Sequence, residues 1–85
     1  MRYYTYILLS QKNGDIYAGS TQNVQIRLSL HNQGRVKSTK GYRPWKLLEF
    51  TEFDNRDDAV IHERFLKNHQ QKETLKKKYG LVAKR

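Results

Sequence analysis

Arg27 and His31 are the two residues whose types and spacing first suggest chemistry. They are four positions apart in a segment predicted to be a helix over residues 24–33, so both fall on one side of it. The other side is polar and is expected to face solvent; it carries Gln22, Gln25, Ser29 and Asn32. A guanidinium presents paired donors that suit phosphate oxygens, and an imidazole moves protons near neutral pH. Folding alone gives no reason to bury such a pair, because a buried guanidinium without a partner would cost several kcal/mol of stability. The alternative is an arginine whose stem packs while its head reaches solvent or a carboxylate.

Two tyrosines precede this helix on predicted strands. The strands cover residues 3–9 and 15–20, and Asn13-Gly14 between them is typical of a hairpin turn because both residues tolerate a positive φ. A two-residue turn would place Ser10 opposite Tyr17. Since side chains alternate along a strand, Tyr6 and Tyr17 would then lie on the same face of the sheet. A bulged three-residue loop would change this pairing.

Further elements must hold these residues in place. Thr21 or Asn23 can begin the helix over 24–33, and Gly34 can end it. A third strand is predicted over 45–53, and Asp54-Asn55 can cap a helix over 56–68. A short basic helix follows, anchored by Leu75 and Tyr79. The expected order of elements is therefore β-β-α-β-α-α.

Glu63 is the acidic residue with the most apolar surroundings on the helix over 56–68. Ala59 and Val60 lie one turn before it and Leu66 lies almost one turn after it. The alternative is a surface pair between Glu63 and Lys67, worth only tenths of a kcal/mol, about 0.2–0.5. The neighbouring His62 falls nearer the outer side of the helix, so we expect it to be a surface residue and not a ligand.

The charge of the chain favours a polyanionic partner. Seventeen lysines and arginines stand against eight acidic residues, a formal net charge of +9, and nucleic acid is the commonest partner of such a surface. Residues 35–46 are expected to form a mobile basic loop that contacts nucleic acid through Arg35, Lys37, Lys40, Arg43 and Lys46. Tyr42 and Trp45 within it could stack on bases, although Trp45 could equally belong to the core. Near the end of the chain, Lys76, Lys77 and Lys78 form either a second contact with nucleic acid or a solvated tail.

Length and composition limit the other possibilities. Eighty-five residues allow one compact domain, 1–85, with a modest core. Because there is no cysteine, disulfides and thiolate metal sites are excluded. No apolar run approaches the roughly 20 residues of a membrane span, and the N-terminal run is too short for a signal peptide. We expect a cytoplasmic protein that does not enter membranes.

The ordered set of motifs resembles the GIY-YIG nuclease domain. Tyr4-Thr5-Tyr6 stands eleven residues before Tyr17-Ala18-Gly19, and Arg27, His31 and Glu63 follow in order. The likeness covers nearly the whole chain and is greatest to small single-domain bacterial members, which are similar to the nuclease half of eukaryotic enzymes that cut branched DNA. The departures are Tyr4 in place of the first glycine, Ala18 in place of a β-branched residue, and no clear match to a late asparagine.

The resemblance implies a fold and an activity. The fold would be α+β, a three-stranded antiparallel sheet flanked by helices. The activity would be that of a divalent-metal-dependent endonuclease, with Mg²⁺ or Mn²⁺ held by Glu63 alone and a general base or water-positioning role for Tyr6. Tyr17 would orient the phosphate, Arg27 would stabilise its charge, and His31 would move a proton. Gly19 would leave room where the backbone approaches the substrate.

The substrate expected from this resemblance is single-stranded or branched DNA, cut with little sequence specificity in repair or recombination. RNA is a further expected partner, and the oligomeric state is left open. The competing hypothesis is a basic module that binds RNA or the ribosome without catalysis. Glu63 separates the two, since a carboxylate facing Arg27 and two phenols would repel phosphate unless a cation came between them.

Overall fold

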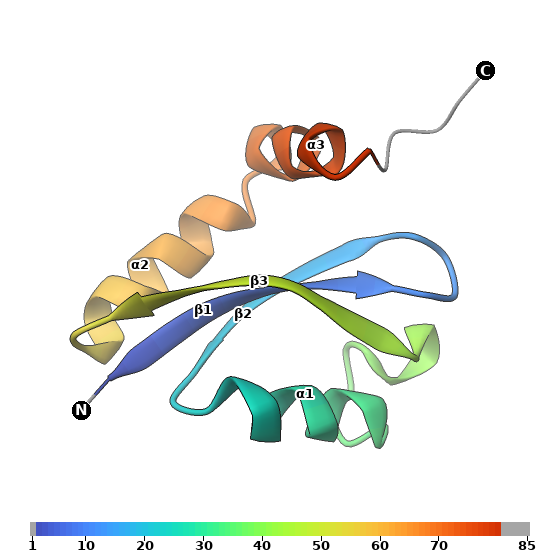
Figure 1. The fold of residues 1–85 in the computed structure, drawn as a ribbon, viewed down its shortest axis with the longest axis horizontal. Helices are drawn as coiled ribbons and strands as arrows, with labels where there is room; N and C mark the ends of the chain where they lie inside the picture. Colours follow the sequence, from blue (N-terminus) through green and yellow to red (C-terminus); the bar gives the residue numbers. More distant parts are fainter. Residues whose placement is uncertain (1, 81–85) are drawn as a thin grey trace.

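The structure is a computed structural model that describes residues 2–80, and its elements follow the expected order. Strands β1 (Tyr3–Ser10), β2 (Ile16–Thr21) and β3 (Trp45–Phe53) form one antiparallel sheet in the order β2-β1-β3. Helix α1 (Val24–Asn32) covers one face, whereas α2 (Arg56–Leu66) and α3 (His69–Lys78) lie on the other (Figure 1). The predicted α+β class and three-stranded sheet are confirmed. None of the helices formed by residues 2–80 has the length and hydropathy needed to span a bilayer.

The β1–β2 hairpin has a longer loop than the two-residue turn that we considered. Residues 11–14 form the loop, and Tyr17 pairs with Leu8 instead of Ser10. The Ser10 hydroxyl accepts hydrogen bonds from the backbone N–H groups of Lys12 and Asn13, each at 3.1 Å, which closes the loop early. Gly14 takes a φ of +77° there. The register is displaced by two residues, so the predicted shared face of Tyr6 and Tyr17 is nevertheless correct.

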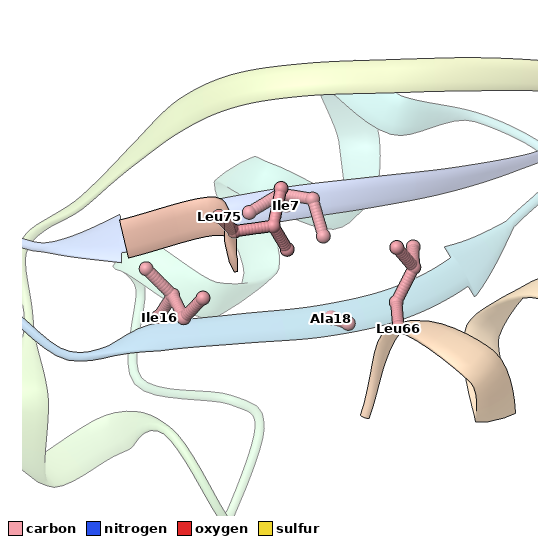
Figure 2. Close-up of a cluster of buried hydrophobic side chains, with 5 residues drawn as sticks. All are labelled: Ile7, Ile16, Ala18, Leu66 and Leu75. Atoms are coloured by element: carbon pink, nitrogen blue, oxygen red, sulfur yellow. The ribbon is translucent and has the colours of Figure 1, made fainter. Parts of the chain in front are cut away.

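Each face of the sheet carries its own apolar cluster. On the α1 face, Tyr6, Leu8, Val24 and Trp45 are buried, with Tyr4, Tyr17, Leu28 and Leu47 packed against them. On the other face, shown in Figure 2, side chains from β1 and β2 meet one residue each from α2 and α3; the cluster consists of Ile7, Ile16, Ala18, Leu66 and Leu75. Trp45 is therefore a core residue, which removes it as a base-stacking surface.

Helix α1 begins and ends close to the predicted points. Asn23 is its N-cap and accepts a hydrogen bond from the backbone N–H of Ile26 at 3.0 Å. Gly34, with a φ of +79°, follows its end. The Asn32 side chain both donates to and accepts from the backbone of Trp45, at 3.0 and 2.6 Å, so the end of α1 is tied to the start of β3. Ile26, in the first turn of α1, is 60% exposed.

The segment before β3 has more internal structure than the mobile loop that we expected. It includes a short 3-10 helix, η1 (Lys40–Tyr42), and a buried threonine, Thr39. The indole N–H of Trp45 donates to the Thr39 carbonyl at 2.9 Å, and the Ser10 hydroxyl donates to the Tyr42 carbonyl at 2.7 Å. These bonds fasten the segment to the end of the sheet and fix the position of Thr39.

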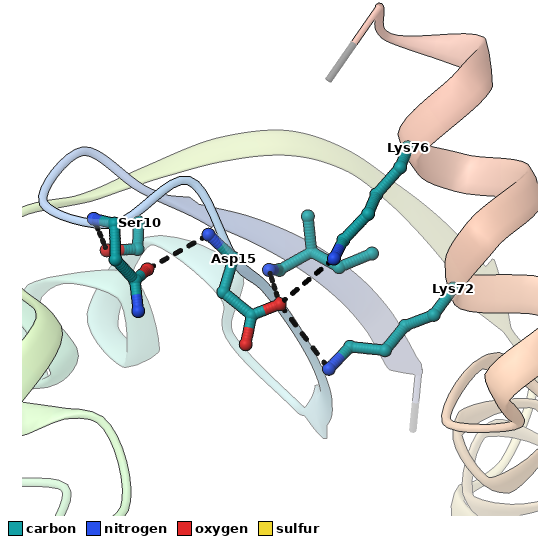
Figure 3. A network of polar contacts seen from close by, with 6 residues as sticks. Ser10, Asp15, Lys72 and Lys76 are labelled. Atoms are coloured by element: carbon teal, nitrogen blue, oxygen red, sulfur yellow. Dashed lines mark hydrogen bonds and ion pairs between the residues drawn. The ribbon is translucent and has the colours of Figure 1, made fainter. Parts of the chain in front are cut away.

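Ion pairs attach α3 to the sheet. Oδ1 of Asp15, beside the hairpin loop, lies 3.5 Å from Nζ of Lys72 and 3.6 Å from Nζ of Lys76 (Figure 3). Glu49 on β3 similarly accepts from Lys78 and from the Tyr79 hydroxyl. The hydrogen bond from Tyr79 is the main influence that lowers the pKa of Glu49 below its ordinary value. Two of the three lysines assigned to nucleic-acid contact, Lys76 and Lys78, therefore already have acidic partners.

Candidate active site

Of the five predicted catalytic residues, His31 and Tyr17 lie against Tyr6, and the charges of Arg27 and Glu63 act on its phenol. Its oxygen lies 2.9 Å from Nε2 of His31, and its ring centroid is 6.4 Å from that of Tyr17. Arg27 acts to lower the pKa of this phenol, whereas the charges of Tyr17 and Glu63 act to raise it. Burial outweighs the favourable effect of Arg27 and raises the pKa of Tyr6 to about 12. Tyr6 is therefore a neutral phenol in this arrangement and not a ready-made base.

The site lies at the outer edge of β2 and draws on both faces of the sheet. Tyr17 points to the α1 face with Tyr6, whereas Ser20, three residues later, points to the α2 face and meets Glu63. Tyr6 pairs across the strands with Gly19. A Cβ at Gly19 would lie 2.5 Å from Cζ of Tyr6. Gly19 therefore makes room for the Tyr6 ring, and its implied role in leaving room where the backbone approaches the substrate stays a prediction.

Gly19→Ala is expected to lower the free energy of unfolding by about 1–3 kcal/mol, because the added methyl must displace the buried Tyr6 ring. Urea denaturation measures the change. Gly41→Ala is the matched control, since a Cβ there meets nothing within 4 Å, and it should change stability by no more than about 0.5 kcal/mol. Equal stabilities for the two variants would contradict the packing of Tyr6 against Gly19.

His31 is completely buried and is held through both ring nitrogens. Nδ1 lies 2.7 Å from the Thr39 hydroxyl, and that hydroxyl also donates to the Val36 carbonyl at 3.3 Å. A hydroxyl that donates to Val36 must accept from His31, so the proton is assigned to Nδ1. Nε2 is then free to accept from the Tyr6 O–H. Burial, helped by the positive charge of Arg27, lowers the pKa of His31 to about 4, so the imidazole is neutral at pH 7.

The lowered pKa of His31 makes stability depend on pH. In the unfolded chain His31 is protonated below about pH 6.5, whereas in the folded chain it is protonated only below about pH 4. The contribution of His31 to the free energy of unfolding is therefore fully present above pH 6.5 and is lost as the pH falls from 6.5 to 4. The unfolding free energy of the wild type should fall between pH 7 and pH 4.5 by about 2 kcal/mol more than that of His31→Gln. Urea denaturation at both values measures this difference. Parallel losses in the two proteins would contradict a buried, neutral His31.

Arg27 supplies the positive charge of the site. Its side chain is half-buried on α1, and among residues 2–80 no carboxylate lies within salt-bridge distance of it. Its charge instead acts on Tyr6 and His31. The alternative that Arg27 pairs with a carboxylate is therefore wrong, and its charge is available for an anionic ligand.

Glu63 lies on α2, on the other face of the sheet from α1, and its charge acts on the Tyr6 phenol. Its side chain is only 20% exposed, and it accepts a hydrogen bond from the Ser20 hydroxyl at 2.5 Å. Burial alone would raise its pKa, but the hydrogen bonds from Ser20 and Lys67 and the charges of Lys67 and Arg64 together lower it below the ordinary value. Glu63 is therefore ionised at pH 7. The neighbouring His62 also turns inward, contrary to expectation: its Nδ1 lies 2.9 Å from the Thr5 hydroxyl.

The residues present fit a cation that needs few protein ligands. No group of three or more His, Asp or Glu side chains comes together among residues 2–80, which excludes a multi-ligand metal cage in that part of the chain. Mg²⁺ keeps most of its waters and commonly takes only one or two carboxylates. The ionised Glu63, held by Ser20 and already attracting the Lys67 ammonium at 2.9 Å, has the chemistry for such a single-carboxylate site.

Two groups of basic residues surround this site at a greater distance. Those from residues 35–46 are all exposed. Lys40 and Arg43 line one hollow with Lys12, and none of the residues that line it is acidic. Of the C-terminal group, Lys77 is exposed, whereas Lys76 and Lys78 form ion pairs with Asp15 and Glu49. The hollow is thus the better candidate for contact with a nucleic-acid backbone.

Ser20, Thr39 and Lys67 belong to the site although the sequence did not single them out. Ser20 could have been suggested by its place directly after Gly19 on β2. Lys67 had a signal, its spacing of four from Glu63, but this spacing is equally typical of an ordinary surface pair. No sequence pattern pointed to Thr39, because its contact with His31 depends on how residues 33–38 fold back.

Comparison with known proteins agrees with this geometry. The profile of the GIY-YIG catalytic domain matches residues 2–79. The UPF0213 protein YsiG of Lactococcus lactis subsp. lactis is 40% identical over 83 residues, covering 95% of this chain and 75% of the relative. A UPF0213 protein of Pediococcus pentosaceus is 37% identical over 82 residues, covering 93% and 85%.

A solved structure extends the comparison to the fold. The solution NMR structure of a UPF0213 protein from Bacillus halodurans shares 33% identity with this chain and has a TM-score of 0.54, over 88% of this chain and 82% of the other. The match to the catalytic-domain profile indicates a nuclease. The chain belongs to the GIY-YIG family.

Proposed function

We propose that this protein is a divalent-metal-dependent endonuclease that hydrolyses phosphodiester bonds of single-stranded or branched DNA. One observation carries the proposal: Arg27, His31, Tyr17 and Glu63, which come from three elements, all act on the phenol of Tyr6 or stack beside it. Folding alone gives no reason to gather a guanidinium, a carboxylate and two phenols at one strand edge. Phosphodiester hydrolysis needs an activated water and stabilisation of the growing negative charge, and groups of these kinds can supply both.

Proton movement in the proposed reaction depends on Tyr6 and His31. Because His31 is neutral and its Nε2 accepts from Tyr6, it can take the phenolic proton as Tyr6 takes one from the attacking water. Thr39 keeps the imidazole in the required tautomer through Nδ1. Because the pKa of Tyr6 is about 12, almost none of the phenol is ionised at pH 7, and a neutral phenol is a poor base. We therefore propose that Tyr6 passes its own proton to His31 as it accepts one from the water.

Charge stabilisation is the proposed role of the remaining residues. The Arg27 guanidinium would contact the non-bridging oxygens of the phosphate, where negative charge grows in the transition state. Tyr17, with its ring centroid 5.2 Å from that of His31, would orient the phosphate through its hydroxyl. Glu63 would hold Mg²⁺ or Mn²⁺, which when bound polarises the phosphate and stabilises the leaving oxygen.

The preference for DNA with little sequence specificity is proposed from the basic surface. Lysine and arginine contacts to phosphates position a strand but do not read its bases. The hollow lined by Lys12, Lys40 and Arg43 offers such contacts beside the segment that holds Thr39 and His31.

The test is an incubation of the purified protein with labelled single-stranded, duplex and branched DNA and with RNA, in Mg²⁺, Mn²⁺ or EDTA. We expect cleavage of single-stranded or branched DNA in either metal and none in EDTA. Cleavage in EDTA would contradict the metal dependence. Salt-sensitive binding without cleavage of any substrate would favour the competing function, a nucleic-acid-binding module.

A further inference from the structure

Lys67 pairs with the carboxylate that is proposed to hold the metal ion. Its Nζ lies 2.9 Å from Oε2 of Glu63, while the Ser20 hydroxyl donates to Oε1 at 2.5 Å. Both oxygens of the carboxylate therefore have protein partners. A cation that binds Glu63 through Oε2 would compete with the lysine ammonium for this oxygen.

We propose that Lys67 is an exchangeable cation that holds the Glu63 carboxylate until a divalent metal ion replaces it. The inference rests on the proposed function, because it concerns the same carboxylate. It makes Lys67 a positioning residue: the ammonium keeps Glu63 ionised and directed into the site, and it withdraws when the metal ion binds.

The position of Lys67 in the fold suits this exchange. It is the C-cap of α2, and its backbone N–H donates to the carbonyls of Glu63 and Arg64, so its backbone is fixed at the end of the helix. Its side chain is 49% exposed and flexible, so the ammonium can leave Glu63 without any change in the fold. A compact charge on a four-carbon stem is well suited to release, whereas a forked guanidinium would bind the carboxylate more firmly.

A contact outside α2 distinguishes this arrangement from an ordinary surface pair. Nζ of Lys67 also lies 5.6 Å from the centroid of the Tyr17 ring, on β2. The ammonium is therefore held between Glu63 and Tyr17. When released from Glu63, it would stay beside Tyr17, where the phosphate is proposed to bind.

The charges are consistent with the exchange. Glu63 and Lys67 together are neutral. A divalent ion on Glu63 leaves one positive charge, which one phosphate neutralises, and the freed ammonium can then serve a second phosphate oxygen. If the ammonium remained on Glu63, the metal ion would have to bind beside an adjacent positive charge.

The test measures the dissociation constant of Mn²⁺ for the full chain by electron paramagnetic resonance of the free ion, at fixed ionic strength and without DNA. Lys67→Gln removes the competing charge and should bind Mn²⁺ about fivefold more tightly. This factor corresponds to the upper end of the free energies measured for exposed ion pairs. Lys67→Arg keeps the charge and should not bind more tightly than the wild type. Lys72→Gln removes a nearby lysine that pairs with Asp15 instead, and should agree with the wild type within about twofold.

Three outcomes decide between the possibilities. An unchanged dissociation constant in Lys67→Gln overturns the exchange. An equal gain in Lys72→Gln also overturns it, because the effect would then be one of general charge. If Glu63→Gln binds Mn²⁺ as tightly as the wild type, the metal site of the proposed function fails, which is a separate result from a failure of the exchange.

Discussion

Glu63→Gln is expected to lower the rate of DNA cleavage in Mg²⁺ by about 10³-fold or more, the largest effect of any single substitution in the site. The amide has the shape of the carboxylate but no charge, so it can still meet Ser20 but cannot hold a divalent ion. The side chain is 20% exposed, and loss of the pair with Lys67 should cost little stability. Single-turnover cleavage of a labelled single-stranded DNA measures the effect.

Glu73→Gln is the matched control for this substitution. Glu73 is an exposed acid on α3, so the variant makes the same change in charge away from the site. Its cleavage rate should equal that of the wild type. A Glu63→Gln variant that cleaves at the wild-type rate would show that the carboxylate has no part in catalysis.

Arg27→Ala should have the second largest effect, a loss of about 10²-fold or more in rate with DNA binding largely kept. The guanidinium has no carboxylate partner among residues 2–80, so its removal exposes no buried acid. What is lost is a donor to the phosphate oxygens as negative charge grows. Single-turnover rates together with an equilibrium binding measurement separate the two effects.

Two controls accompany this prediction. Arg56→Ala removes an exposed arginine at the start of α2 and should cleave normally. Arg27→Lys keeps the charge without the planar fork and should recover only part of the lost rate. A variant Arg27→Ala that binds DNA poorly but cleaves the bound strand at the normal rate would make Arg27 a binding residue and not a catalytic one.

Much of this site could be predicted from sequence because its residues lie on regular elements. The spacing of Arg27 and His31 places both on the inward side of α1, and strand alternation brings Tyr6 and Tyr17 to one face. The hairpin loop is longer than a two-residue turn, but the register differs by two residues and not by one, so Tyr6 and Tyr17 still lie on the same face. The longer loop arises from the Ser10 hydroxyl, a local side-chain interaction that competes with the Asn13-Gly14 turn.

The parts that could not be predicted depend on contacts between distant segments. Thr39 reaches His31 because the chain after α1 folds back beneath Trp45, and no periodic pattern encodes that path. The exposure of His62 was misjudged because its side chain packs on the Phe53 ring, with centroids 5.1 Å apart, at the end of the sheet. The packing of the Tyr6 ring over Gly19 was also not predicted, because only the cross-strand pairing brings these two residues together.

The most direct test of the account is the single-turnover cleavage rate of Tyr6→Phe. This change removes one oxygen atom, the atom on which His31 and Arg27 both act, and keeps the ring that packs against Gly19. The account predicts a rate lower by about 10²-fold, with the variant still folded by urea denaturation and still able to bind DNA. A folded Tyr6→Phe protein that cleaves DNA at the wild-type rate would contradict the central claim that the Tyr6 phenol is the centre of the active site.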